Sequence, residues 1–443
     1  MSVAAAKGAF MRLRQAIQES ATLATNSGAL AIGAIATAGL GFVYWWLAAR
    51  LFPPEAIGNA SALLSVIGLI GLLGEAGLGT LLIGEIVRHP HKVPALVGAA
   101  AAIGVALTIG LALSFIFGAH FIGSANLIDG WLAASVFVIG CGLTAFTMVV
   151  DQAFVGSLNS TIRMIQQVLF SVFKLMLIAA AAVVSQTSST TILLTWVAGI
   201  LASWIAVDLI TKGGARRLVG IPDFRLLHTF RRKVFDHYAL DVTLQAPGII
   251  VPYLVLVLLS SAATAAFSAL WMLVSTAAVI PAVLATVLFP VVRAGPSKSR
   301  HHFTLSLTVS LLFSLICAVF IFLYSEKILE LFNPAYREIA GSSLRFLGFS
   351  LLGSTLKFHA CTLARLSDAM RKASLPFALG GLLELGFLIV GAKLGGLEGL
   401  VVGWTIAVTI EGICVALLWV FVTNLGFPDC RSREFTSPPP VQI

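Results

Sequence analysis

About a dozen long apolar stretches follow one another along this chain, and only short polar loops separate them. A helix that crosses a membrane needs about 20 consecutive apolar residues. The mean hydropathy is +1.00 and only 11% of the residues are charged, whereas soluble domains carry about 25% charged residues. The sequence therefore predicts an all-α polytopic membrane protein whose surface faces lipid.

The apolar stretches divide into two sets of six predicted transmembrane helices. The first set covers residues 24–49, 57–87, 93–119, 129–156, 160–185 and 189–211, and the second covers 234–259, 265–293, 301–325, 336–364, 374–394 and 396–424. We expect an N-terminal six-helix lobe over 1–211, a basic linker over 212–233, a C-terminal six-helix lobe over 234–424, and a tail over 425–443.

The positive charges alternate from one side of the predicted membrane to the other. With the N-terminus in the cytoplasm, 21 of the 28 lysines and arginines fall in inner segments, four in outer loops and three within helices. Cytoplasmic loops are enriched in Lys and Arg, so both termini are expected in the cytoplasm. The net charge of +9 is then a topology signal, with anionic membrane lipids as the natural partner and no role for nucleic acid.

The sequence holds no signature of an enzyme or of a bound cofactor. Phosphate-binding glycine loops, nucleophile elbows and histidine pairs at metal-ligand spacing are all missing. Four cysteines lie in separate predicted helices and Cys430 lies in the tail, so we interpret them as packing residues. We expect neither catalysis nor a cofactor or metal site, and we leave open whether H⁺ or Na⁺ drives any transport.

Several segments spread over nearly the whole chain carry a resemblance. They are residues 47–58 with Pro53-Pro54, the glycine-rich 73–79, Asp241, Phe289-Pro290, 331–336 and 395–399. In these segments the chain resembles the Wzx-type oligosaccharide-lipid flippases of the multidrug/oligosaccharidyl-lipid/polysaccharide exporter superfamily. It departs from the family pattern where Asn333-Pro334 replaces the usual glycine region. The resemblance implies a V-shaped transporter of two six-helix lobes that works by alternating access on a lipid-linked glycan.

Charged side chains inside the bilayer are costly unless they are paired or hydrated, so they mark candidate sites. Lys174 lies about 14 residues into its helix, roughly 21 Å by helical rise, and we expect it in a water-filled cavity. There it would contact a substrate phosphate, or else form a structural ion pair. Arg345 is expected to extend its side chain to the outer interface. Lys357 is intermediate between a deeply placed charge such as Lys174 and an interfacial one such as Arg345. The acidic candidates are Glu75, Asp151, Asp241, Glu384 and Glu411, as ion-coupling groups or as partners of these bases.

The seventh predicted helix is the candidate gate. Asp241 and Gln245 share one face at a spacing of four residues. Pro247-Gly248 and Pro252 follow and remove backbone hydrogen bonds, which permits bending.

Together with these features, the resemblance implies a flippase in the bacterial inner membrane. By the same resemblance it would move an anionic lipid-linked oligosaccharide, with undecaprenyl pyrophosphate as the carrier, for polysaccharide biosynthesis and export. A polysaccharide polymerase and glycosyltransferases would be its partners. Two alternatives stay open: a cation-coupled drug exporter of the same superfamily, with an acidic cluster in one lobe and an aromatic cavity, and a non-transport membrane subunit of a glycan synthase complex.

Overall fold

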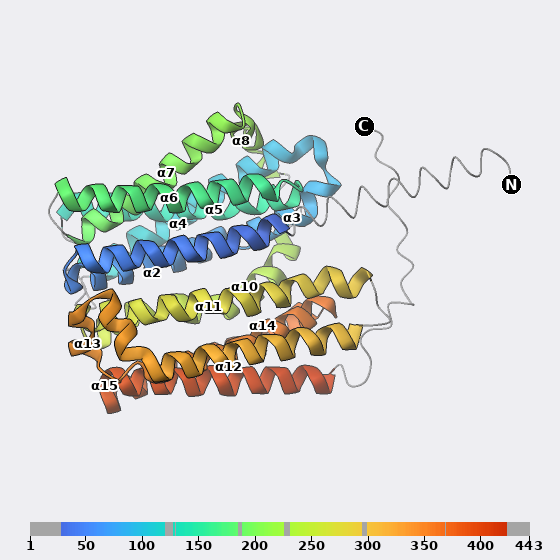
Figure 1. Ribbon diagram of the computed structural model, residues 1–443. Coiled ribbons are helices and arrows are strands. Elements are labelled where there is room, and N and C mark those ends of the chain that lie inside the picture. Colours follow the sequence, from blue (N-terminus) through green and yellow to red (C-terminus); the bar gives the residue numbers. More distant parts are fainter. Residues whose placement is uncertain are drawn as a thin grey trace.

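The computed structural model describes residues 28–119, 127–128, 130–184, 188–225, 231–294, 299–367 and 369–422, and these contain helices and connecting turns but no strand. Ten helices in these ranges are long and apolar enough to cross a membrane. They lie roughly parallel to one another in an elongated bundle (Figure 1). The prediction of an all-α, multi-pass membrane protein is confirmed.

Six passes make up the first half of the bundle. They are an N-terminal helix Gly28–Leu51, α2 Pro54–Glu75 with its continuation α3 Leu78–Arg88, α4 Val93–Ala119, α5 Gly130–Gly156, α6 Ser160–Val184 and α7 Ser189–Ile210. The sequence predicted an unbroken helix over 57–87, which is wrong. Ala76 and Gly77 take left-handed conformations at φ 51° and 71°, so α2 ends and α3 begins in a new direction.

Short elements and a second set of helices complete the chain. They are η1 Pro90–Lys92, α8 Gly214–Leu218, α10 Arg231–Leu258, α11 Ser261–Ala294, α12 Ser299–Phe332, α13 Pro334–Ala340, η4 Arg345–Phe349, α14 Ser350–Leu366 and α15 Met370–Val422. The predicted helix 336–364 is also interrupted. It divides into α13, η4 and α14, because Gly341 at φ 49° ends α13.

The long helix α15 is two passes joined by a sharp reversal. Gly395 and Gly396 have non-helical backbone angles, with φ of −140° and 56°. On either side of them the two halves pack backbone to backbone, since a Cβ at Gly391 would strike the Gly399 carbonyl. Among the ten long helices, α15 counts as two passes. The shorter α14, with 17 residues, adds one more. The described helices thus make the twelve passes that the sequence predicts.

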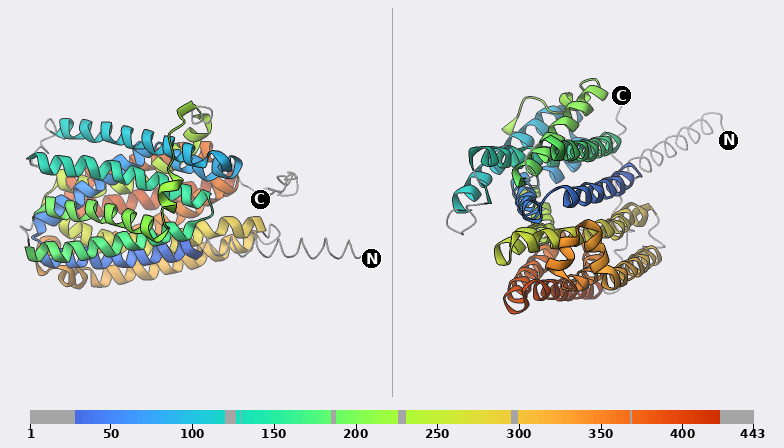
Figure 2. Two further views of the ribbon diagram at one scale, coloured as in Figure 1. Left: turned by 90° about the horizontal axis from the view of Figure 1, so that it is seen from above. Right: turned by 60° about the vertical axis from the view of Figure 1, so that its left-hand side comes forward.

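The helices of the two halves of the chain gather on opposite sides of the bundle (Figure 1). The N-terminal helix and α2 to α7 form one side, α10 to α15 form the other, and two further views show the same division (Figure 2). One buried apolar cluster joins them, with Tyr44 and Ile57 from the first half and Phe267, Phe332 and Tyr336 from the second. The exact domain boundaries stay a prediction, and residues 226–230 of the linker and the tail lie outside the described residues.

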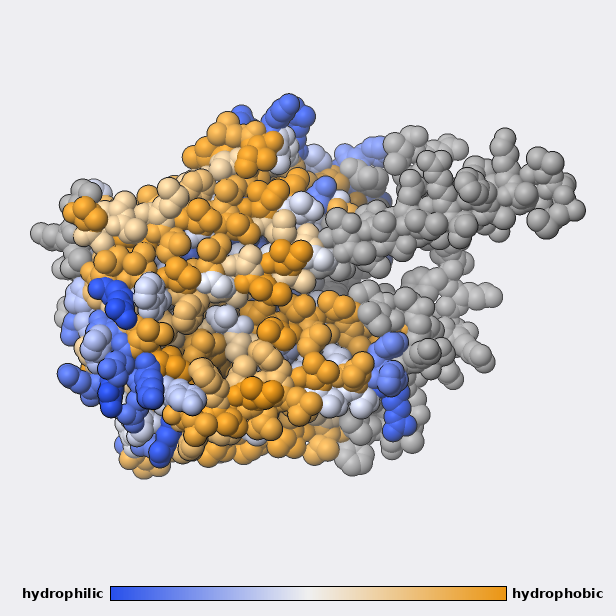
Figure 3. Space-filling model, in the orientation of Figure 1, coloured by the Kyte–Doolittle hydropathy of each residue, from blue (hydrophilic) through white to orange (hydrophobic). Residues whose placement is uncertain are grey.

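The surface carries a broad apolar belt (Figure 3). Hydrophilic residues gather at the end of the bundle near α13 and at the opposite end. Such a belt matches the hydrocarbon layer of a membrane, where lipid-facing side chains are apolar. The helices therefore run from one membrane surface to the other.

Candidate functional site

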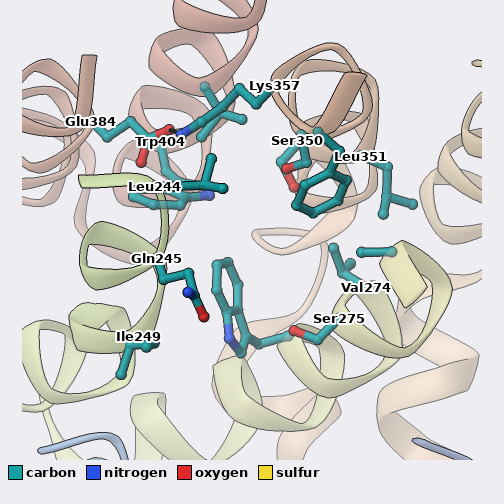
Figure 4. A pocket seen from close by; sticks show the side chains of 16 residues that line it. Leu244, Gln245, Ile249, Val274, Ser275, Ser350, Leu351, Lys357, Glu384 and Trp404 are labelled. Carbon is teal, nitrogen blue, oxygen red and sulfur yellow. Dashed lines mark hydrogen bonds and ion pairs between the residues drawn. The ribbon is translucent and has the colours of Figure 1, made fainter. Parts of the chain in front are cut away.

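A cavity of about 410 Å³ lies within the second half of the molecule, between α10, α11, α14 and α15. Apolar, aromatic and hydrogen-bonding side chains line it together, among them Gln245, Ile249, Trp271, Ser275, Ser350, Ser354, Lys357, Glu384 and Trp404. Figure 4 shows Gln245 and Ser275 on one side of this space and Lys357 beside Glu384 on the other. A concave, largely apolar site with a few placed polar groups is typical of ligand pockets.

Two tryptophans form an aromatic wall of the cavity. Trp271 stacks on Phe267 with ring centroids 5.4 Å apart, and it meets Trp404 edge to face at 5.7 Å. Gly248 of α10 lies opposite, where even a Cβ would stay 4.0 Å from the Trp271 ring. These fixed rings give the cavity a flat apolar surface next to the amide of Gln245. Neither tryptophan stands out in the sequence, because nothing in the linear order of residues places them together.

Lys357 forms a buried cluster with two glutamates at one end of the cavity. Its Nζ donates to Glu384 Oε1 at 2.6 Å and to Glu411 Oε2 at 2.9 Å. Glu384 lies in the first half of α15 and Glu411 in the second, and the three side chains are only 1–7% exposed. Lys357 does line the cavity, but protein carboxylates take the place expected for a substrate phosphate.

Helix α10 carries one predicted site residue into the cavity and another to the contact between the halves. Gln245 lines the cavity. Asp241, one turn earlier, accepts from Arg365 of α14 at 2.9 Å and from Thr80 of α3 at 3.2 Å. The helix runs unbroken from Arg231 to Leu258 through Pro247 and Pro252, so the prolines do not interrupt α10 in this state.

Lys174 lies elsewhere, in a cage of three aromatic rings. Its Nζ is 4.2 Å from the centre of the Trp196 ring, 4.7 Å from that of Phe170 and 5.1 Å from that of Tyr44. The residue is 5% exposed, and none of the described carboxylates lies within ion-pair distance. The expectation of a water-filled cavity is wrong, because the faces of aromatic rings compensate this cation.

No model of a known protein family matches the chain, and no curated protein matches it either. Several solved structures are similar to it. An inward-facing multidrug resistance MATE family transporter of the MOP superfamily superposes with a TM-score of 0.69 at 13% identity, covering 88% of this chain and 94% of its own. A MOP superfamily transporter from Pyrococcus furiosus, reported with a binding pocket of reversed polarity, gives 0.62 at 16%, covering 90% and 95%. The chain has the fold of the MOP-superfamily transporters.

An outward-facing MATE transporter of the MOP superfamily gives a lower TM-score of 0.62 at 15% identity, covering 90% of this chain and 95% of its own. The two halves of this fold are in close contact at the end of the bundle near α13. Asn333 donates to the Ala49 carbonyl at 2.7 Å, and Arg50 donates to the Leu331 carbonyl at 2.7 Å. Gly58 of α2 touches the Ser261 carbonyl of α11 so closely that no side chain would fit.

The remaining predicted site residues have local partners outside the cavity. Asp151 lies 3.4 Å from Arg163 and accepts from Gln167 at 3.1 Å. Glu75 accepts from the Gly79 amide at 2.8 Å and so caps the start of α3. Arg345 reaches Glu398 at 3.8 Å with 40% of its side chain exposed. Of the residues singled out in the sequence, the structure brings Lys357, Gln245, Glu384 and Gly248 to the cavity.

No group of three or more histidine, cysteine, aspartate or glutamate side chains could hold a metal ion within the part of the chain that the structure describes.

Proposed function

We propose that the protein is a transporter that moves an anionic lipid-linked oligosaccharide across the bacterial inner membrane by alternating access. The observation that carries the proposal is the lining of the cavity, where the faces of Trp271 and Trp404 lie beside the polar groups of Gln245, Ser275 and Ser354. A sugar ring presents a C–H face and a rim of hydroxyl groups, and such a wall of rings and hydrogen-bonding groups is complementary to both.

The charge of the cavity supports an uncharged sugar as its occupant. Lys357 and Glu384 are the two charged side chains in its lining, and they form an ion pair. A phosphate would have to displace a carboxylate from Lys357. The displaced carboxylate would then be buried without its partner, at a high cost in free energy. The phosphate of the carrier would instead cross between the halves, near the half-exposed Arg365, while the polyprenyl chain stays in lipid.

The test is flipping of a fluorescent lipid-linked oligosaccharide in vesicles that contain the purified protein, followed by a quencher that reaches only the outer leaflet. We expect Trp271→Ala to slow flipping at least tenfold and Trp271→Phe to keep most of the rate, because a ring face is retained. Trp131→Ala is the matched control, since Trp131 is 80% exposed and does not line the cavity. If Trp271→Ala flips the glycan at the wild-type rate, the cavity is not the sugar site.

One observation favours a second candidate, a cation-coupled drug exporter. Glu384 and Glu411 are an acidic pair within one half of the molecule, next to an aromatic cavity. The inward-facing MATE transporter that superposes with a TM-score of 0.69 is described as a multidrug resistance protein. Uptake of a fluorescent organic cation into the same vesicles, driven by a Na⁺ or H⁺ gradient and without glycan flipping, would favour this candidate over the flippase.

A further inference from the structure

The Lys357 cluster has the geometry of a cation site whose cation is a side chain. Three helical segments meet there: α14 provides the ammonium group, and the two halves of α15 provide one carboxylate each. Gly380 is required for this arrangement, because a Cβ there would strike the Glu411 carboxylate. The two acids therefore face one central position, which Lys357 Nζ occupies.

The cluster has more acidic groups than basic ones. One ammonium group lies between two carboxyl groups, and all three side chains are almost fully buried. In addition, Glu411 Oε1 is buried and has no hydrogen-bond partner among the described residues. Buried charges are stable only when they are paired and hydrogen-bonded. Removal of Lys357 would leave two carboxylates that require another cation.

The other titratable groups near the cluster have partners elsewhere. Leu244 and Gln245 of α10 and the lining residues of α11 are uncharged. His359 on α14 contacts Ser306 of α12 at 3.1 Å. The next ion pair, Asp241 with Arg365, lies about two turns along α14, roughly 12 Å from Lys357 by helical rise. Within the described ranges, Lys357 is thus the cation that balances the two acids.

We propose that the Lys357–Glu384–Glu411 cluster is a monovalent-cation site that the chain fills with its own ammonium group. Lys357 and Glu384 both line the cavity, so a shortened residue 357 opens the site to ligands that enter from there. The site then takes a small primary ammonium ion or Na⁺. In the wild-type protein the tethered ammonium is not exchanged, and the stability of this half does not depend on the cation in solution. The inference does not rest on the substrate proposed above.

The test is thermal unfolding of full-length Lys357→Ala in detergent, in choline, sodium and n-propylammonium chloride. Propylammonium has the atoms that the substitution removes. We expect a melting temperature well below wild type in choline, and a rise with n-propylammonium that grows with the logarithm of its concentration, as for any ligand that binds only the folded state. A smaller rise is expected with Na⁺. Wild-type protein should melt at one temperature in all three salts.

Two further variants make the result decisive. Lys357→Met fills the space without charge and should show no shift with propylammonium. If Lys357→Ala does not fold, the double variant Lys357→Ala/Glu411→Gln replaces it, because it has one uncompensated acid fewer. Its melting temperature should still rise with propylammonium, which would bind to Glu384. The triple variant that also carries Glu384→Gln should not respond. Absence of any shift in both Lys357→Ala and the double variant, or an equal shift in the wild-type protein, overturns the proposal.

Discussion

The two buried lysines of this protein are compensated in different ways. Lys357 has two carboxylates at 2.6 and 2.9 Å, whereas Lys174 has only ring faces at 4.2–5.1 Å. A cation over an aromatic face gains about 0.5–2 kcal/mol, which is less than the cost of removing it from water. The cage around Lys174 therefore tolerates the ammonium group, and the folded state does not require it.

This difference predicts how Lys174 variants behave. We expect Lys174→Met to fold with an unchanged or higher melting temperature and to keep transport activity, because an apolar chain of similar size fits among Tyr44, Phe170 and Trp196. Lys174→Glu should lose on the order of 3 kcal/mol, since an anion would face the negative faces of these rings. Thermal unfolding in detergent measures both. A stable Lys174→Met variant that no longer transports would instead assign a functional role to the charge.

At the scale of single helices, the seam between α2 and α11 holds the two halves together at the end of the bundle that is expected to be outer. Gly58 lies against the Ser261 carbonyl, and one turn further Ser268 donates to Ser61 at 2.9 Å. A backbone carbonyl cannot move aside as a flexible side chain can. The two helices therefore meet in one closely packed line that a single methyl group would separate.

We expect Gly58→Ala to open this seam at a cost of about 1–3 kcal/mol, the usual range for overpacking. A cysteine introduced at Ser61 should then react several-fold faster with a water-soluble thiol reagent added from outside. Gly39→Ala is the control, because nothing lies within 4 Å of a Cβ built there. Equal reaction rates in the Gly58→Ala and Gly39→Ala backgrounds would show that the seam does not close the outer end.

The prolines of α10 give a second prediction about an element. Pro247 packs against Gly381 of α15, and the helix is continuous through both prolines. If they allow α10 to bend in another state, Pro247→Ala/Pro252→Ala should restore backbone hydrogen bonds and slow transport several-fold, with normal insertion. Flux in vesicles, at matched protein content, is the measurement. Undiminished flux would reduce both prolines to packing residues.

For the whole molecule, the sequence predicted what depends on hydropathy along the chain. The twelve passes and the reversal between the last two follow from the length of apolar runs and from Gly395-Gly396. The helix breaks at Ala76-Gly77 and at Gly341 could not be predicted in this way, because a hydropathy average does not register single residues with left-handed backbone angles. The sequence offered Glu384 and Glu411 as possible partners of the buried bases but did not decide which base they pair with. Glu384 and Glu411 meet Lys357 only because α15 folds back, and the rings around Lys174 come from three helices.

The orientation of the molecule is the last prediction. Twelve passes place the first and last described residues at the same end of the bundle, and the 21 basic residues of the inner segments assign that end to the cytoplasm. Cys430, which lies beyond the described residues, should therefore resist a membrane-impermeant thiol reagent in intact cells and react after permeabilisation. Glu338→Cys is the positive control. Glu338 is exposed on α13, at the opposite end, and its cysteine should react without permeabilisation. Labelling of Cys430 in intact cells, with Glu338→Cys protected, would invert the predicted topology.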